Sequence, residues 1–171
     1  RVVDTPVSNV DWIPTLLELA GEEAPSGLDG ISFAEGLVGG EFPERPLFWH
    51  FPHYTNQGGR PGGAMREDKW LLVELYDVDR VELYDLSEDV GERHDLAGQH
   101  PERVQTMRAA LDAWRRENDV QHNRPNPDCD ENAFRALYVD VDPSRFDPVA
   151  ADEEDWSRIK AWREGMDDVV R

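Results

Sequence analysis

The chain has 171 residues, and its 37 acidic side chains outnumber its 18 basic ones, which gives a formal charge of −19 with histidine neutral. This charge excludes nucleic-acid backbones as natural partners, because polyanions are held by clustered Lys and Arg, and it disfavours anionic membranes for the same reason. The 39% of hydrophobic residues suffices for one ordinary core. No stretch approaches the roughly 20 apolar residues of a membrane span, and the single cysteine, Cys129, excludes an intrachain disulfide.

The first predicted element is an amphipathic helix at residues 7–21. Ser8 or Asn9 can cap its start, and Gly21 ends the pattern. Apolar residues recur at helical spacing, namely Val10, Ile13, Leu16, Leu17 and Ala20. We therefore expect one face of this helix to cover a core. Residues 22–45 are rich in Gly and Pro, which predicts a surface connection with a short helical turn at residues 32–37.

The middle of the chain predicts a small sheet and one long helix. Four extended runs occur, at residues 46–51, 64–66, 69–76 and 81–86. Short polar turns separate the last three, so we expect an antiparallel meander of three to four strands. Pro101 begins a helix at residues 101–118, and Val104, Met107, Ala110 or Leu111, and Trp114 form its apolar stripe. Such a helix on a sheet makes a two-layer α+β unit.

The last third of the chain predicts a tail that ends in a helix. Residues 119–151 contain several prolines and little periodicity, which indicates an extended segment around the body. A helix follows from Asp152, with Trp156, Ile159, Trp162 or Arg163, Met166, and Val169 or Val170 along one side. We expect this helix to dock, because an exposed Trp forfeits about 1.5–3 kcal/mol of burial free energy.

The long loop at residues 52–63 is the strongest candidate for function, because loops of this length are usually functional or disordered. His50 and His53 flank its start. As a metal pair they are weak, since residues i and i+3 of a strand point to opposite faces. A second interpretation is a buried, hydrogen-bonded His50 with His53 at a strand end. The third is a lip that binds a sugar and an anionic substituent, with substrate-binding candidates His50, His53, Tyr54 and Arg60, together with Asn56 and Gln57.

Other chemistry finds no support in the residues. Cys129 lies among three acidic residues, which makes it a poor nucleophile. The acidic run at residues 88–92 lacks the ligand spacing of a calcium loop and is better explained as a solvated turn. There is no glycine-framed nucleophile and no phosphate-binding glycine loop. We therefore predict no catalytic and no metal-binding residue in this chain.

Several strings, in their order, resemble the type I, formylglycine-dependent sulfatases, which are arylsulfatase-like members of the alkaline-phosphatase superfamily. They cover residues 6–118 and comprise the closing helix of the catalytic domain at residues 6–21, the "DG-x-S" segment at 28–33, the "RPLFW" strand at 45–50, the carboxyl-terminal hairpin at 64–66 and 70–73, and the "ELYDL" tail at 82–86 and 92–97. The chain departs from the family where Leu71 replaces Lys, Asp68 replaces Gly, Val90 replaces Pro and Asp95 replaces Asn. These departures bear on local detail and not on the resemblance as a whole.

The resemblance implies a sulfatase whose reactive centre lies upstream of this chain. In that family a Cys-x-Pro/Ala-x-Arg motif supplies formylglycine, and calcium neutralises the sulfate. Cys129 is followed by Asp130 and Glu131, so it does not match the motif. We expect calcium and formylglycine to belong to the full-length parent and not to this chain, which alone should be inactive. The resemblance also implies a sulfated carbohydrate substrate and a periplasmic or secreted location.

The expected organisation has three parts. Residues 1–22 end the catalytic domain, residues 23–118 form the sulfatase C-terminal subdomain, and residues 119–171 form an extension. The partner of the subdomain is then the catalytic domain of the same full-length chain, and the isolated piece should self-associate through its apolar patches. Two alternatives stay open: a stand-alone carbohydrate-binding or interaction module, and the C-terminal part of a related phosphoester hydrolase.

Overall fold

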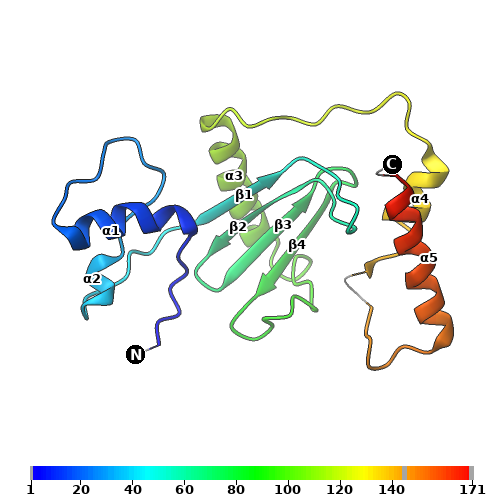
Figure 1. Cartoon of the computed structure of the whole chain (residues 1–171), viewed down its shortest axis with the longest axis horizontal. Helices are drawn as coiled ribbons and strands as arrows, with labels where there is room; N and C mark the ends of the chain where they lie inside the picture. The colour runs from blue at the N-terminus through cyan, green and yellow to red at the C-terminus, as the bar shows by residue number, and fades with distance from the viewer. Residues whose placement is uncertain (1, 144–145, 170–171) are drawn as a thin grey trace.

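The computed structural model describes residues 2–143 and 146–169. Figure 1 shows short helices near the N-terminus, a central sheet with a long helix against it, and further helices near the C-terminus. The elements are η1 (Asn9–Asp11), α1 (Trp12–Ala20), α2 (Ala34–Leu37), β1 (Leu47–Phe51), β2 (Gly62–Glu67), β3 (Trp70–Leu75), β4 (Arg80–Asp85), α3 (Pro101–Glu117), α4 (Glu131–Tyr138) and α5 (Glu153–Val169).

The buried carboxylate of Asp11 organises the N-terminal region. It accepts the backbone N–H of Ser8 at 2.7 Å and that of Ile31 at 3.0 Å, and it pairs with the Arg45 guanidinium. Gly30 crosses η1, just before α1, so closely that a Cβ there would lie 2.0 Å from the Val10 carbonyl oxygen. The segment that resembles the family's "DG-x-S" string is therefore held against α1 by one carboxylate and one side-chain-free residue.

A small aromatic core joins α1 to α2. Phe33 lies edge-on to Trp12, with ring centroids 5.1 Å apart, and stacks on Phe42. Its backbone N–H donates to the Thr15 hydroxyl. These contacts run across the boundary expected between residues 22 and 23, and the division into three parts stays a prediction.

The outer face of α1 is apolar and open. Ile13, Leu16 and Leu19 are each more than half exposed, and Val10 and Trp12 are nearly so. The sequence pattern predicted an apolar face that covers a core. The residues described here leave this face uncovered, so it is free to meet another surface.

The central sheet is a four-stranded antiparallel meander in the order β1-β2-β3-β4, as predicted. Trp49 pairs with Ala64, and Leu72 pairs with Leu83. Asp68, in the turn between β2 and β3, has φ of 52°. That left-handed conformation favours glycine, which is the residue typical of the resembling family at this position.

One face of the sheet is buried by α3. Met65, Leu72 and Leu83 from the sheet pack against Met107 and Leu111 of α3, and none of the five is more than 3% exposed. At the edge, the Phe48 ring of β1 stacks on the ring of Trp114 in α3, 5.3 Å apart and nearly parallel. The predicted two-layer α+β unit is confirmed.

The tail differs from its predicted form in one respect. The extended segment expected at residues 119–151 contains the helix α4, so that part of the prediction is wrong. Asp130 caps α4, because its carboxylate accepts the N–H groups of Asn132 and Ala133. A local capping signal thus outweighs the prolines around it.

The terminal helix α5 docks as predicted. Met166 is fully buried and Trp162 is partly buried, whereas Trp156 is about half exposed and lies against the edge of the Phe146 ring. The side chain of Val169 and the whole of Val170 lie outside the described residues. Within the described chain, none of the helices combines the length and apolar character needed to cross a membrane.

The open face of α1 predicts self-association of residues 1–171. Its apparent mass in light scattering should rise with protein concentration, because association removes the apolar side chains from water. Replacing Ile13 and Leu16 with Glu should keep the chain monomeric. The control Val90→Glu, at a residue that is 83% exposed in a distant turn, should behave like the unaltered chain. A monodisperse monomer at every concentration would contradict the prediction.

Candidate functional site

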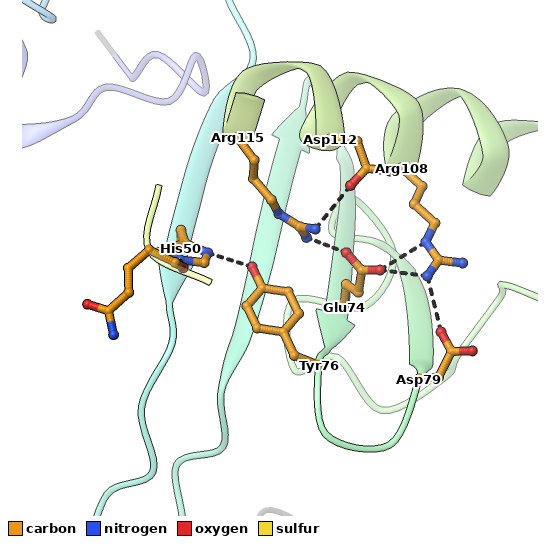
Figure 2. Close-up of polar contacts among 8 residues, drawn as sticks. His50, Glu74, Tyr76, Asp79, Arg108, Asp112 and Arg115 are labelled. Atoms are coloured by element: carbon orange, nitrogen blue, oxygen red, sulfur yellow. Dashed lines mark hydrogen bonds and ion pairs between the residues drawn. The ribbon is translucent and has the colours of Figure 1, made fainter. Parts of the chain in front are cut away.

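The edge strand β1 presents its side chains to two different faces. Phe48 and His50 lie on the side of α3, whereas Trp49 and Phe51 point to the opposite side and are about half exposed. The two nitrogens of His50 are both engaged: Nδ1 lies 2.7 Å from the hydroxyl oxygen of Tyr76, and Nε2 lies 2.8 Å from the carbonyl oxygen of Gln121 (Figure 2). This geometry agrees with the interpretation of His50 as a hydrogen-bonded structural residue.

His53 is exposed, as are Tyr54, Asn56 and Gln57 of the predicted set. It follows Pro52 in the β1–β2 loop (residues 52–61), and its ring lies edge-on to Phe51 with centroids 5.3 Å apart. No hydrogen bond to its imidazole is recorded among the described residues, while His50 is held on the other face of β1. The structure therefore leaves the His53 imidazole open to solvent or to a ligand.

Tyr54 and Arg60 turn toward the protein. Both bind the same carboxylate oxygen of Asp77, the Tyr54 hydroxyl donating at 2.9 Å and the Arg60 Nε donating at 3.0 Å. Arg60 Nη1 also donates to the carbonyl oxygen of Tyr138 at 2.7 Å, and the Arg60 side chain is only 19% exposed. The guanidinium expected to meet a ligand anion is thus occupied by groups of the chain itself.

The tyrosines of this region remain neutral hydrogen-bond donors. Burial, and then the hydrogen bond to Asp77, raise the pKa of Tyr54 well above its usual range. Burial also raises the pKa of Tyr76, against an opposing effect of the nearby Arg115. Neither phenol is therefore suited to act as a base near neutral pH.

A network of ion pairs beneath α3 supports the loop. The Glu74 side chain of β3 is only 8% exposed. It accepts a hydrogen bond from the Nε–H of Arg108 at 2.9 Å and also pairs with Arg115. The Arg115 guanidinium lies over the Tyr76 ring, 4.7 Å from its centroid. Figure 2 shows the contact of His50 with Tyr76 and, beside it, the ion pairs of Glu74 with Arg115 and Arg108. The base of the loop is therefore linked to α3.

Sequence reasoning missed the residues that hold the loop. Asp77, Gln121 and Tyr138 receive the hydrogen bonds of Arg60, Tyr54 and His50. Two of these three contacts use backbone carbonyl oxygens, which every residue carries, so the residue type gives no signal. The only available signal was an acidic residue, Asp77, in a short turn.

The described residues do not fit the cofactors that the sulfatase resemblance implies. Nowhere in residues 2–143 and 146–169 do three or more His, Cys, Asp or Glu side chains gather as a metal site would need. Cys129 is exposed and precedes the capping residue of α4, without the motif of a formylglycine precursor. No step of a reaction is therefore derived through calcium or formylglycine in this chain.

Several known proteins are similar to this chain in sequence and in fold. The model of the family "N-sulphoglucosamine sulphohydrolase, C-terminal" matches residues 1–117. A sulfatase from Formosa agariphila is 34% identical over 156 residues, which cover 80% of this chain and 27% of that protein. A Delta 4,5-hexuronate-2-O-sulfatase from Bacteroides thetaiotaomicron is 29% identical and covers 78% of this chain and 26% of that protein. The solved structure of a 2-O GAG sulfatase superposes with a TM-score of 0.53 at 27% identity, covering 67% of this chain and 27% of that chain.

The antiparallel sheet, its covering helix and these matches define the C-terminal part of a sulfatase of the alkaline-phosphatase superfamily. The chain belongs to the N-sulphoglucosamine sulphohydrolase, C-terminal family. It spans about a quarter of the length of these relatives.

The buried carboxylate of Glu74 should contribute strongly to stability. Replacing Glu74 with Gln removes the buried carboxylate that Arg108 and Arg115 share and leaves them only more exposed acidic partners. Breaking such a buried pair should lower the free energy of unfolding by about 3 kcal/mol. Asp79→Asn is the matched control, because Asp79 pairs with the same Arg108 while its side chain is 87% exposed. This substitution should change the free energy of unfolding by less than about 0.5 kcal/mol. Urea unfolding followed by tryptophan fluorescence measures both; equal effects would contradict the assignment.

Proposed function

We propose that this chain completes a sulfatase that hydrolyses sulfate esters of carbohydrates, and that it borders the substrate cleft without supplying the reactive centre. The family match over residues 1–117 is the observation that carries the proposal. The names of the hexuronate-2-O-sulfatase and the 2-O GAG sulfatase favour a sulfated carbohydrate as the substrate class.

The proposed division of labour has a physical reason. Cleaving a sulfate ester requires preorganised cations and a nucleophile at the sulfur, which are held best on a rigid scaffold. In the full-length enzyme, calcium and formylglycine would supply these, outside the residues described here. The selection of the sugar can be assigned to a loop, because loops carry recognition groups on a fixed framework.

Two exposed apolar surfaces support a role as part of a larger chain. The outer face of α1 carries Ile13 and Leu16, and the outer side of β1 carries Trp49 and Phe51. Exposed apolar surface of this kind is typical of interfaces, and about three-quarters of each relative lies outside the matched region. We propose that the catalytic domain of the full-length sulfatase covers these surfaces.

His53 is the residue proposed to face the sugar. Its imidazole is exposed beside the ring of Phe51, and an imidazole can donate to or accept from a sugar hydroxyl. Tyr54 and Arg60 belong to the same proposed lip, but their hydrogen bonds to Asp77 favour a role in holding the loop. His50, bound at both nitrogens, holds its base.

The test is kinetic and uses the full-length enzyme. His53→Ala should lower kcat/KM for sulfated disaccharides from heparan or chondroitin sulfate about tenfold, the loss of about 1.4 kcal/mol of transition-state binding. The value for para-nitrophenyl sulfate should fall much less, since that substrate has no sugar to recognise.

His94→Ala is the control, because His94 lies in the distant turn after β4 and its side chain is 80% exposed. It should leave both kcat/KM values unchanged. Equal and negligible effects of His53→Ala on the two kinds of substrate would remove His53, and with it the proposed border of the cleft.

A further inference from the structure

The tip of the β1–β2 loop is a turn closed by its own hydrogen bonds. The N–H of Thr55 donates to the carbonyl oxygen of Gly59 at 2.9 Å, and the N–H of Gly59 donates to the Thr55 hydroxyl at 2.9 Å. The N–H of Gly58 donates back to the Thr55 carbonyl oxygen at 3.2 Å. The turn is therefore a defined shape that can be held or released as a unit.

Arg60 connects this turn to two other segments. Its Nε and Nη2 lie 3.0 and 2.9 Å from the carboxylate of Asp77, a residue in the turn between β3 and β4. Its Nη1 donates to the carbonyl oxygen of Tyr138, the last residue of α4. A cation at a helix C-terminus is favoured by the helix dipole as well as by the hydrogen bond. Arg60 thus ties the loop to the C-terminal extension (residues 119–171).

Aromatic packing reinforces the same junction. The Tyr54 ring lies 4.7 Å from the ring of Tyr138 and 5.9 Å from that of Phe134, centroid to centroid. The Tyr138 hydroxyl donates to the Thr55 carbonyl oxygen at 3.3 Å. The first residues of the turn therefore rest on α4 through Phe134 and Tyr138.

The helix α5 closes over the turn at Gly58. With φ of +85°, a Cβ at Gly58 would lie 2.8 Å from the Trp162 ring and 3.0 Å from Pro143, so only glycine permits this approach. The Trp162 indole N–H in turn donates to the carbonyl oxygen of Leu137 in α4 at 2.8 Å. Figure 1 shows the loop after β1 pointing toward α4 and α5.

His53 lies between two residues that contact the C-terminal extension. Three residues before it, His50 binds the carbonyl oxygen of Gln121 at the start of the extension. One residue after it, Tyr54 packs on Tyr138. The backbone at His53 is thus held on both sides, while its side chain stays exposed.

From these contacts we infer that the C-terminal extension sets the position of His53, and so determines selectivity for the carbohydrate, with Arg60 as the positioning residue. This inference rests on the proposed function of the loop. A positioning device of this kind lowers the entropy cost of binding by preorganising the recognition group. The extension, residues 119–171, lies beyond residue 117, where the family match ends.

The first experiment compares two arginines of the full-length enzyme. Arg60→Met should lower kcat/KM for the sulfated disaccharides about fivefold to tenfold through KM, because a misplaced binding group weakens recognition. Activity toward para-nitrophenyl sulfate should fall less. Arg135→Met is the matched control, because Arg135 lies on α4 with its side chain 62% exposed and, within the described residues, its guanidinium pairs with Asp140 alone. It should leave both substrates unaffected.

A double variant separates this inference from the proposed function. If Arg60 acts through His53, the double variant His53→Ala/Arg60→Met should be no worse than His53→Ala alone, because coupled residues are not additive. Additive losses, or no loss in Arg60→Met, would overturn the inference and leave the proposed function standing. No loss in either single variant would overturn both.

Hydrogen exchange measures directly whether Arg60 holds the turn at residues 55–59. In Arg60→Met the amides of Thr55, Gly58 and Gly59 should exchange faster than in the unaltered enzyme, whereas the amides of β2 and β3 should keep their protection. Unchanged exchange at these three amides would show that the extension does not hold the turn, and would contradict the inference.

Discussion

The packing of α3 on one face of the sheet is the interaction on which the rest of the structure depends. Five nearly inaccessible side chains join the helix to β2, β3 and β4, and Glu74 is fixed between two arginines of that helix. The edge strand β1 receives its place through its pairing with β2, the stacking of Phe48 on Trp114, and the link from His50 through Tyr76. The position of the loop after β1 is therefore set by the core, although the loop contributes little to that core.

The helix α3 covers one face of the sheet, whereas other apolar surfaces of the chain stay exposed. The open surfaces, on α1 and on the outer side of β1, accord with a segment that is about a quarter of its relatives' length. The membership of a sulfatase C-terminal family favours the hydrolase interpretation over a stand-alone module. If the proposed substrate is a sulfated polymer, the net charge of −19 repels it at long range, and the attraction has to come from local groups and from the rest of the full-length protein.

Periodicity and turn chemistry were enough to predict most of the fold. The strands, α3 and α5 follow from alternation, from the apolar stripe and from Pro101, and the ordered strings between residues 6 and 118 indicated the family. The helix α4 was missed because four prolines around it suggested an extended chain, although Asp130 before Asn132 and Ala133 carries a capping signal. The contacts of the candidate site residues could be predicted only in part. A sequence cannot tell whether the guanidinium of Arg60 meets a ligand or is already paired, because its partners Asp77 and Tyr138 lie 17 and 78 residues away.

The central claim is that this chain supports and borders a reactive centre that it does not contain. The most direct test is to incubate purified residues 1–171 and the full-length protein, in parallel, with para-nitrophenyl sulfate and with sulfated disaccharides, and to measure released inorganic sulfate. The account predicts release by the full-length protein and none above the buffer blank by residues 1–171. Release by residues 1–171 at a rate comparable to the full-length protein would contradict it.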